Sequence, residues 1–382
     1  MKSETQTLSP RINKLTKRVL GYDISKAVAM FLVVLLHSSF YVGTIPNNLL
    51  TRALMTSTVI GVPLFITTNG AILLNKPLDI RKHCKKIVRI LFILYSWRAI
   101  HILVYRALGA PAVNVKSAIK MIMGDTNYQG YPMGHFWFLE ALVAIYIVFP
   151  LIKTIFDTNN QRPLILALGA IGVLTFGLDS LRALLEACLG TTGTQISSAL
   201  GFLAKMNIFG PYGYLLIYFV AGGLLGKHYQ AKGSRQETRN IFTCLMILSI
   251  SLVCTVSLHE AQFIRGIAGP YTTTYGYWLI TTLTTTLSIF YLAMVLGNTV
   301  KDTRVASITK FLGSKTLGVY LMHMFGLIAL SKIISLVRMP PHISQTILFL
   351  LSLVAVFLIQ IALSVVAELT SRIPLLRKLM RF

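Results

Sequence analysis

Acidic residues are scarce in this chain of 382 residues: Asp and Glu together number 12, against 36 Lys and Arg, and charged residues make up only 13% of the sequence. Soluble domains carry charge on about a quarter of their residues, so this composition excludes a string of soluble domains. The four cysteines lie at Cys84, Cys188, Cys244 and Cys254, without the spacing of a disulfide framework or a metal site. We therefore expect neither structural disulfides nor a bound metal.

Long apolar runs take the place of the missing charge, with 54% hydrophobic residues and a mean hydropathy of +0.69. Runs of membrane-spanning length predict an all-α polytopic bundle of about ten transmembrane helices. These runs lie near residues 24–42, 57–75, 87–108, 135–152, 164–181, 211–227, 240–258, 275–297, 312–334 and 344–370. The predicted organisation is a basic tail at 1–23, a transmembrane domain at 24–370 and a second basic tail at 371–382.

Basic residues are distributed unequally between the two sides of this predicted bundle. The side that holds both tails carries 26 of the 36 Lys and Arg, and the opposite side carries eight. The positive-inside rule then places both termini in the cytoplasm. The net charge of +24 follows from this topology, and because no nucleic-acid recognition fold is visible we expect no nucleic-acid partner. The polar first 23 residues and the absence of a small-residue cleavage site predict that the first span is an uncleaved anchor.

Lys26 and His37 lie eleven residues apart in the first apolar run, which is almost three helical turns. The two side chains therefore share one helix face, about 16 Å apart along the axis at 1.5 Å per residue. An ionisable residue within a membrane span is costly unless it is paired or functional. This spacing predicts a reaction path that enters beside Lys26 and ends at His37.

Glu140 is expected at the same depth as His37, near the outer end of the fourth span. If the two helices are neighbours, the carboxylate orients the imidazole and stabilises its protonated form, which makes His37 a competent base. A helix–helix hydrogen bond without chemistry is the alternative. Arg98 in the third span also needs a partner, and Glu140 is one candidate, which would compete with the pairing to His37.

Tyr320 and His323 are three residues apart in the ninth span and share a face, so they either line a polar cavity or simply pack. Five cations precede the third span: Arg81, Lys82, Lys85, Lys86 and Arg89. This cluster is a topology signal, a surface for anionic lipids, or a dock for the phosphates of a cofactor. If the cluster lies at the cytoplasmic end of the face that carries Lys26 and His37, it could bind the phosphates of a long thioester whose reactive end extends toward His37.

Together these residues resemble the membrane-bound acyltransferase 3 family, which acylates cell-surface glycans. The resemblance covers most of the chain. Lys26 and His37, after Tyr22-Asp23, match the first-span signature, and Lys86 with Arg89 matches the spaced basic pair. Trp137-Phe138-Leu139 of the fourth span and the ninth-span motif of Gly318, Tyr320 and His323 also match. The second-span signature departs from the family, because Leu64 replaces a Phe and Asn69 replaces a Ser.

The resemblance implies transfer of an acyl group, usually acetyl, from cytoplasmic acyl-CoA to a sugar hydroxyl on the far side of the membrane. We expect His37 to be catalytic, as general base or transient acyl carrier, with Glu140 beside it. The five cations and Lys26 are expected to hold the phosphates of acetyl-CoA, and Asn69, Tyr320 and His323 to line the path of the donor. The implied setting is a bacterial cell membrane with anionic lipids, and a chain without the esterase-like domain that some members carry. The alternatives are a polysaccharide exporter or small-substrate transporter, and a structural membrane subunit.

Overall fold

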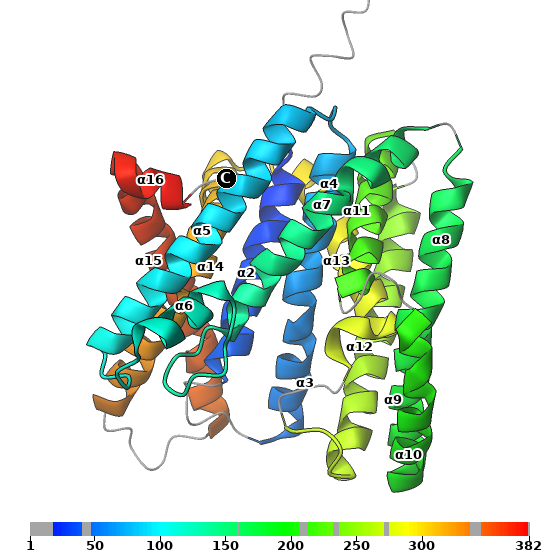
Figure 1. The fold of residues 1–382 in the computed structure, drawn as a ribbon. Coiled ribbons are helices and arrows are strands. Elements are labelled where there is room, and N and C mark those ends of the chain that lie inside the picture. The colour runs from blue at the N-terminus through cyan, green and yellow to red at the C-terminus, as the bar shows by residue number, and fades with distance from the viewer. Residues whose placement is uncertain are drawn as a thin grey trace, which may run out of the picture.

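Helices make up all the regular structure in the computed structural model, which describes residues 18–39, 47–158, 160–206, 212–231, 237–270, 275–336 and 345–380 (Figure 1). The predicted all-α class is confirmed. Residues 1–17 of the predicted first tail, residues 381–382 of the predicted second tail and Arg338, one of the eight basic residues predicted on the opposite side, lie outside the described residues. The helices are α2 (Leu20–Ser38), α3 (Leu49–Ser57), α4 (Gly61–Leu74), α5 (Ile80–Ala107), α6 (Val115–Met123), α7 (Trp137–Asp157), α8 (Arg162–Gly172), α9 (Leu178–Leu189), α10 (Thr191–Leu200), α11 (Gly213–Ala231), α12 (Glu237–Ile264), α13 (Ile280–Thr299), α14 (Thr303–Leu336), α15 (Gln345–Arg372) and α16 (Pro374–Met380).

Within the described ranges, nine helical segments are long and apolar enough to cross a membrane. They are α2, α5, α12, α13, α14 and α15, together with three composite segments at Leu49–Leu74, Gly134–Asp157 and Arg162–Leu189. The remaining predicted span, 211–227, corresponds to α11, which continues past the polar Lys227-His228 to Ala231 and is not among these nine segments. The chain is therefore a polytopic helical bundle, and α11 lies among its inner helices (Figure 1).

Small residues allow the inner helices to approach one another closely. A Cβ atom at Gly70 of α4 would lie 1.8 Å from the carbonyl oxygen of Phe219 on α11, and one at Gly222 of α11 would lie 2.0 Å from that of Thr67. Gly297 of α13 meets the backbone of Gly21 on α2 in the same way. Such contacts are the usual means of packing helices in lipid, where apolar burial between helices gives little driving force. They fix α2, α4, α11 and α13 as the centre of the bundle.

Ion pairs and hydrogen bonds show which helix ends lie together. Arg18 donates to the Asp23 carboxylate at 2.7 and 2.9 Å and to the carbonyl of Lys310 at 2.8 Å, so α2 and α14 begin at one end of the bundle. Lys153 donates to the carbonyl of Leu74 at 2.8 Å, which joins the ends of α7 and α4. We call the end with the start of α2 and the α4–α5 connection the basic end, and the end with Ser38 of α2 and the start of α3 the opposite end.

Three boundaries differ from the sequence prediction. The helix α5 begins at Ile80, seven residues before the predicted third span, so the five cations lie on a helix and not in a loop. Residues 371–382 were predicted to be a tail, but residues 374–380 form α16, and the indole of Trp97 donates to the carbonyl of Leu379 at 2.9 Å. The predicted connection at 182–210 contains the end of α9, α10 and a short 3-10 helix. In each case local helix formation continues beyond the apolar run.

Candidate functional site

His37 lies in the last turn of α2, at the opposite end, and is half-buried. Its Nδ1 atom is 2.8 Å from the carbonyl oxygen of Val33, one turn earlier on the same helix. A carbonyl oxygen only accepts hydrogen bonds, so Nδ1 of the neutral ring carries the proton and Nε2 carries the lone pair. The local helix geometry therefore fixes the tautomer that a general base or nucleophile needs.

Three further histidines gather around His37 from three other helical segments. The ring centroid of His323 on α14 lies 4.9 Å from that of His37, and the centroid of His135, just before α7, lies 6.4 Å away. His135 is 5.1 Å from His323 and 5.2 Å from His101 of α5. His101, His135 and His323 are all buried. We call these four residues the histidine cluster.

Hydrogen bonds to the backbone hold the cluster in place. His101 donates from Nε2 to the carbonyl of Leu321 at 2.9 Å, and the Tyr320 hydroxyl donates to the carbonyl of His135 at 2.5 Å. Each of these bonds joins α14 to another segment of the site. In the described part of the chain, no three His, Cys, Asp or Glu side chains are arranged to hold a metal ion. An imidazole can act as base, acid or nucleophile.

Glu140 forms an ion pair with Arg98, which joins α7 to α5. The side chain of Arg98 is 2% exposed and that of Glu140 is 36% exposed, and Arg98 also donates to the carbonyl of Ile122 at 3.2 Å. Of the two partners considered for Glu140 from the sequence, His37 and Arg98, the structure pairs it with Arg98. The direct partner of His37 on its Nδ1 side is the Val33 carbonyl. A catalytic role of Glu140 stays a prediction.

Lys26 lies at the basic end of α2, and the helix face between it and His37 is closely packed. Ala29 and Met30 have no exposed surface, and Val33 is 3% exposed. The predicted route of a donor along this face is therefore filled by side chains in this structure. An unbranched methionine such as Met30 adapts its conformation more easily than a branched residue.

The five cations of α5 lie at the same end of the bundle as Lys26. Arg81, Lys82, Lys85 and Arg89 are exposed, whereas Lys86 is half-buried with its ammonium 3.2 Å from the hydroxyl of Tyr146. The predicted dock for phosphates is a surface with excess positive charge. It lies at the basic end, next to Lys26. Its role in cofactor binding stays a prediction.

Tyr320 and His323, which were predicted with the donor-binding residues, lie at the His37 end and not beside these cations. A role of these two residues in lining the path of a donor stays a prediction. Asn69 of α4 donates to the carbonyl of Phe65 at 3.1 Å, and the neighbouring Thr68 hydroxyl is 2.7 Å from that of Ser25 on α2. The second-span motif thus connects α4 to the helix that carries Lys26 and His37.

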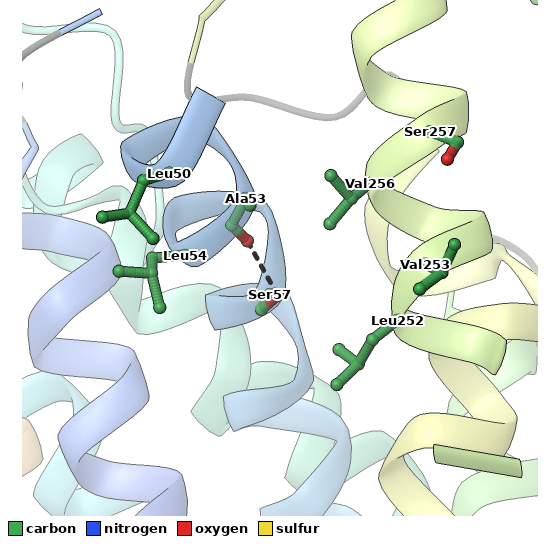
Figure 2. Close-up of a pocket in the computed structure, with 8 residues that line it drawn as sticks. All are labelled: Leu50, Ala53, Leu54, Ser57, Leu252, Val253, Val256 and Ser257. Atoms are coloured by element: carbon green, nitrogen blue, oxygen red, sulfur yellow. Dashed lines mark hydrogen bonds between the residues drawn. The ribbon is translucent and has the colours of Figure 1, made fainter. Parts of the chain in front are cut away.

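An apolar groove of about 350 Å³ lies between α3 and α12. Figure 2 shows Leu252 and Val256 pointing from α12 toward α3, whose Leu50 and Leu54 also line the groove. The Ser57 hydroxyl in its wall donates to the carbonyl of Ala53 at 2.8 Å. None of the eight residues that line this groove is titratable, so it contributes no acid, base or strong nucleophile. The reactive groups lie in the histidine cluster instead.

Neither His135 nor His101 was predicted as a site residue from the sequence. His135 is the first residue of the predicted fourth span, and an ionisable residue at that position was the available signal. His101 is one turn from Arg98 on α5, so the two share a helix face. Periodicity does not reveal that the histidines of α2, α5, α14 and the 3-10 turn before α7 lie at one point.

These features define a multi-pass membrane protein with a buried histidine cluster near one end and exposed cations at the other. The acyltransferase 3 model, described as an acyltransferase domain, matches residues 19–366. The match covers most of the chain, so this protein belongs to the acyltransferase 3 family, as the sequence resemblance indicated. Searches of curated proteins and of solved structures return no match. The family assignment identifies acyl transfer as the chemistry of the domain.

Proposed function

We propose that this protein transfers an acetyl group from cytoplasmic acetyl-CoA to a hydroxyl of a cell-surface or lipid-linked glycan on the other side of a bacterial cell membrane. The observation that carries this proposal is His37, whose Nδ1–H is held by the Val33 carbonyl. Its Nε2 lone pair is thereby presented inside an acyltransferase domain. A neutral imidazole in this tautomer takes a proton from a hydroxyl or attacks a thioester carbonyl.

The two ends of the bundle support the proposed direction of transfer. Acetyl-CoA carries several phosphates, and Arg81, Lys85 and Arg89 offer exposed cations at the end that the charge distribution assigns to the cytoplasm. The same surface attracts anionic lipids, which keeps this end at the membrane. From there, the donor's reactive end reaches His37 along the face of Lys26 and Met30 when those side chains move apart.

The proposal is tested with purified full-length protein in lipid nanodiscs, radiolabelled acetyl-CoA and glycans extracted from the source cell surface. We expect label on the glycan with the unchanged protein. His37→Ala should lower the transfer rate by about 10²–10⁴-fold, the range for loss of a general base. His228→Ala, at an exposed histidine at the end of α11, is the matched control and should transfer normally.

Retained transfer by His37→Ala would overturn the assignment of His37. In a parallel assay with the protein in sealed lipid vesicles, movement of glycan across the bilayer without label on the glycan would show that the protein is a transporter instead. Label on glycan in the unchanged protein and its loss in His37→Ala, with normal acetyl-CoA binding in both, supports the proposed enzyme.

A further inference from the structure

His323 has a buried nitrogen with no partner. Its side chain has no exposed surface, and its Nδ1 is 2.6 Å from the carbonyl oxygen of Tyr320. The proton of the neutral ring is therefore on Nδ1, and Nε2 is an acceptor. Among the described residues, this Nε2 meets no hydrogen-bond donor. Buried polar atoms are paired in the great majority of cases, so an orphaned acceptor beside a reactive group points to a ligand that supplies the donor.

The neighbouring His101 shows what a purely structural histidine looks like at the same place. Its Nε2 donates to the carbonyl of Leu321 at 2.9 Å, and its Nδ1 lies 3.2 Å from the hydroxyl of Tyr105. Both nitrogens have a partner: Nε2 joins α5 to α14, and Nδ1 meets a side chain one turn further along α5. His323 uses only one nitrogen in this way, and its second nitrogen remains for another group.

In both His37 and His323, Nδ1 carries the proton and Nε2 carries the lone pair. Each ring is locked through Nδ1 by a carbonyl of the preceding helical turn, Val33 in one case and Tyr320 in the other. The ring centroids are 4.9 Å apart with an interplanar angle of 70°. Two imidazoles with lone pairs on Nε2 therefore lie side by side, one half-buried and one fully buried.

We propose that His37 is a transient acyl carrier and that His323 is the base that discharges it. This assignment rests on the proposed function and chooses between the two roles that chemistry allows for His37. A single imidazole cannot carry the acyl group on Nε2 and also take a proton on Nε2. The second step of such a mechanism therefore needs a second base within reach, and His323 supplies it.

In the first step, Nε2 of His37 attacks the thioester carbonyl. An N–C bond forms, the C–S bond breaks, and the CoA thiolate leaves while His37 becomes an acylimidazolium with Nδ1–H still on the Val33 carbonyl. In the second step, the acceptor hydroxyl attacks the acyl carbon and passes its proton to Nε2 of His323. An O–C bond forms, the C–N bond to His37 breaks, and His37 returns to its neutral form. The proton on His323 finally passes through solvent to the CoA thiolate, which balances charge.

This order of events suits a reaction whose two substrates come from opposite sides of a membrane. The donor leaves before the acceptor hydroxyl reacts, so the two need not occupy the bundle together. The hydroxyl of the glycan then donates a hydrogen bond to His323 Nε2, which otherwise has no hydrogen-bond donor in the described part of the chain. The unpaired Nε2 of His323 is therefore hydrogen-bonded only when the glycan is bound.

The test uses His323→Asn in the full-length protein. The Asn side-chain amide occupies the position of Nδ1 and keeps a donor for the Tyr320 carbonyl, but it has no group at the position of Nε2. Unchanged protein, His323→Asn and His37→Asn are mixed with radiolabelled acetyl-CoA without glycan and quenched rapidly. Glycan extract is then added to a second sample, and the label is followed from protein to glycan.

We expect label on the unchanged protein and on His323→Asn, and none on His37→Asn. On addition of glycan, the label should leave the unchanged protein promptly and leave His323→Asn about 10²–10⁴-fold more slowly, the range for loss of a general base. The proposal is overturned if His323→Asn discharges at the normal rate, or if folded His323→Asn takes up no label. It is also overturned if the unchanged protein acetylates glycan without ever carrying label, an outcome that leaves the proposed function intact. Absence of any acetylated glycan would instead count against the proposed function itself.

Discussion

Arg98 of α5 and Glu140 of α7 form an ion pair whose arginine is almost completely buried. The helix α5 also carries the exposed cations and His101, and His135 lies in the 3-10 turn that leads into α7. A guanidinium at this depth keeps its charge and needs a carboxylate, because an unpaired buried charge is strongly destabilising. The pair therefore fixes how two segments of the histidine cluster sit against each other.

Glu140→Ala should destabilise the protein because it leaves the Arg98 charge uncompensated. Breaking a fully buried pair costs about 3–5 kcal/mol, and we expect a loss at or below the lower end of this range because Glu140 is partly exposed. Thermal unfolding in detergent measures the effect. The double variant Arg98→Met/Glu140→Leu should recover most of the stability. If Glu140→Gln instead abolishes transfer without loss of stability, Glu140 acts in the chemistry and not only in the ion pair.

Gly70→Val should prevent correct packing of α4 against α11. The first carbon of the new side chain would lie 1.8 Å from the carbonyl oxygen of Phe219, which is backbone and cannot rotate away. Gly169→Val on α8 is the matched control, since nothing lies within 4 Å of a Cβ there. Size-exclusion profiles after membrane extraction should show aggregation of the first variant and a normal peak for the second. A normal peak for both would mean that α4 and α11 are farther apart than described.

Removal of the exposed cations Arg81, Lys85 and Arg89 should weaken acetyl-CoA binding. Their charge acts on the donor phosphates, so the KM for acetyl-CoA of the triple alanine variant should rise and become less sensitive to salt. The KM for acetyl-pantetheine, which lacks the nucleotide phosphates, should stay the same. Alanine at the exposed Lys120, on α6, is the control for loss of positive charge. Equal loss with both donors would show that the cations support the fold or the lipid contact instead.

Two native cysteines report the orientation of the chain in the membrane. Cys84 is exposed on α5 at the basic end, and Cys188 is exposed near the end of α9. With the basic end in the cytoplasm, a membrane-impermeant maleimide on intact cells should label Cys188 and spare Cys84, and lysis should make both reactive. Variants Cys84→Ser and Cys188→Ser identify each signal, and the double variant gives the background from Cys244 and Cys254. The reverse pattern would invert the assigned topology.

The sequence by itself determined the helical class, the approximate spans and the family. A continuous apolar run of spanning length is expected to form a helix. In hydrocarbon its backbone N–H and C=O groups must be hydrogen-bonded, and a helix pairs them within the segment. It also placed Lys26 and His37 on one helix face, because a local helical repeat depends only on spacing. Its boundaries were less accurate at α5 and α16, where polar residues continue a helix past its apolar part.

Only the tertiary structure decided which polar groups meet. Sequence spacing left Glu140 with two possible partners, and the approach of α5 to α7 gave it to Arg98. Equally, nothing local indicates that His37 and His323, far apart in the chain, place their rings 4.9 Å apart, with Nε2 of His323 unpaired. Contacts of this kind depend on helix packing, which here is set by close backbone approach at Gly70, Gly222 and Gly297. The chemistry of the site therefore follows from how the helices pack, whereas its individual residues were visible from the sequence.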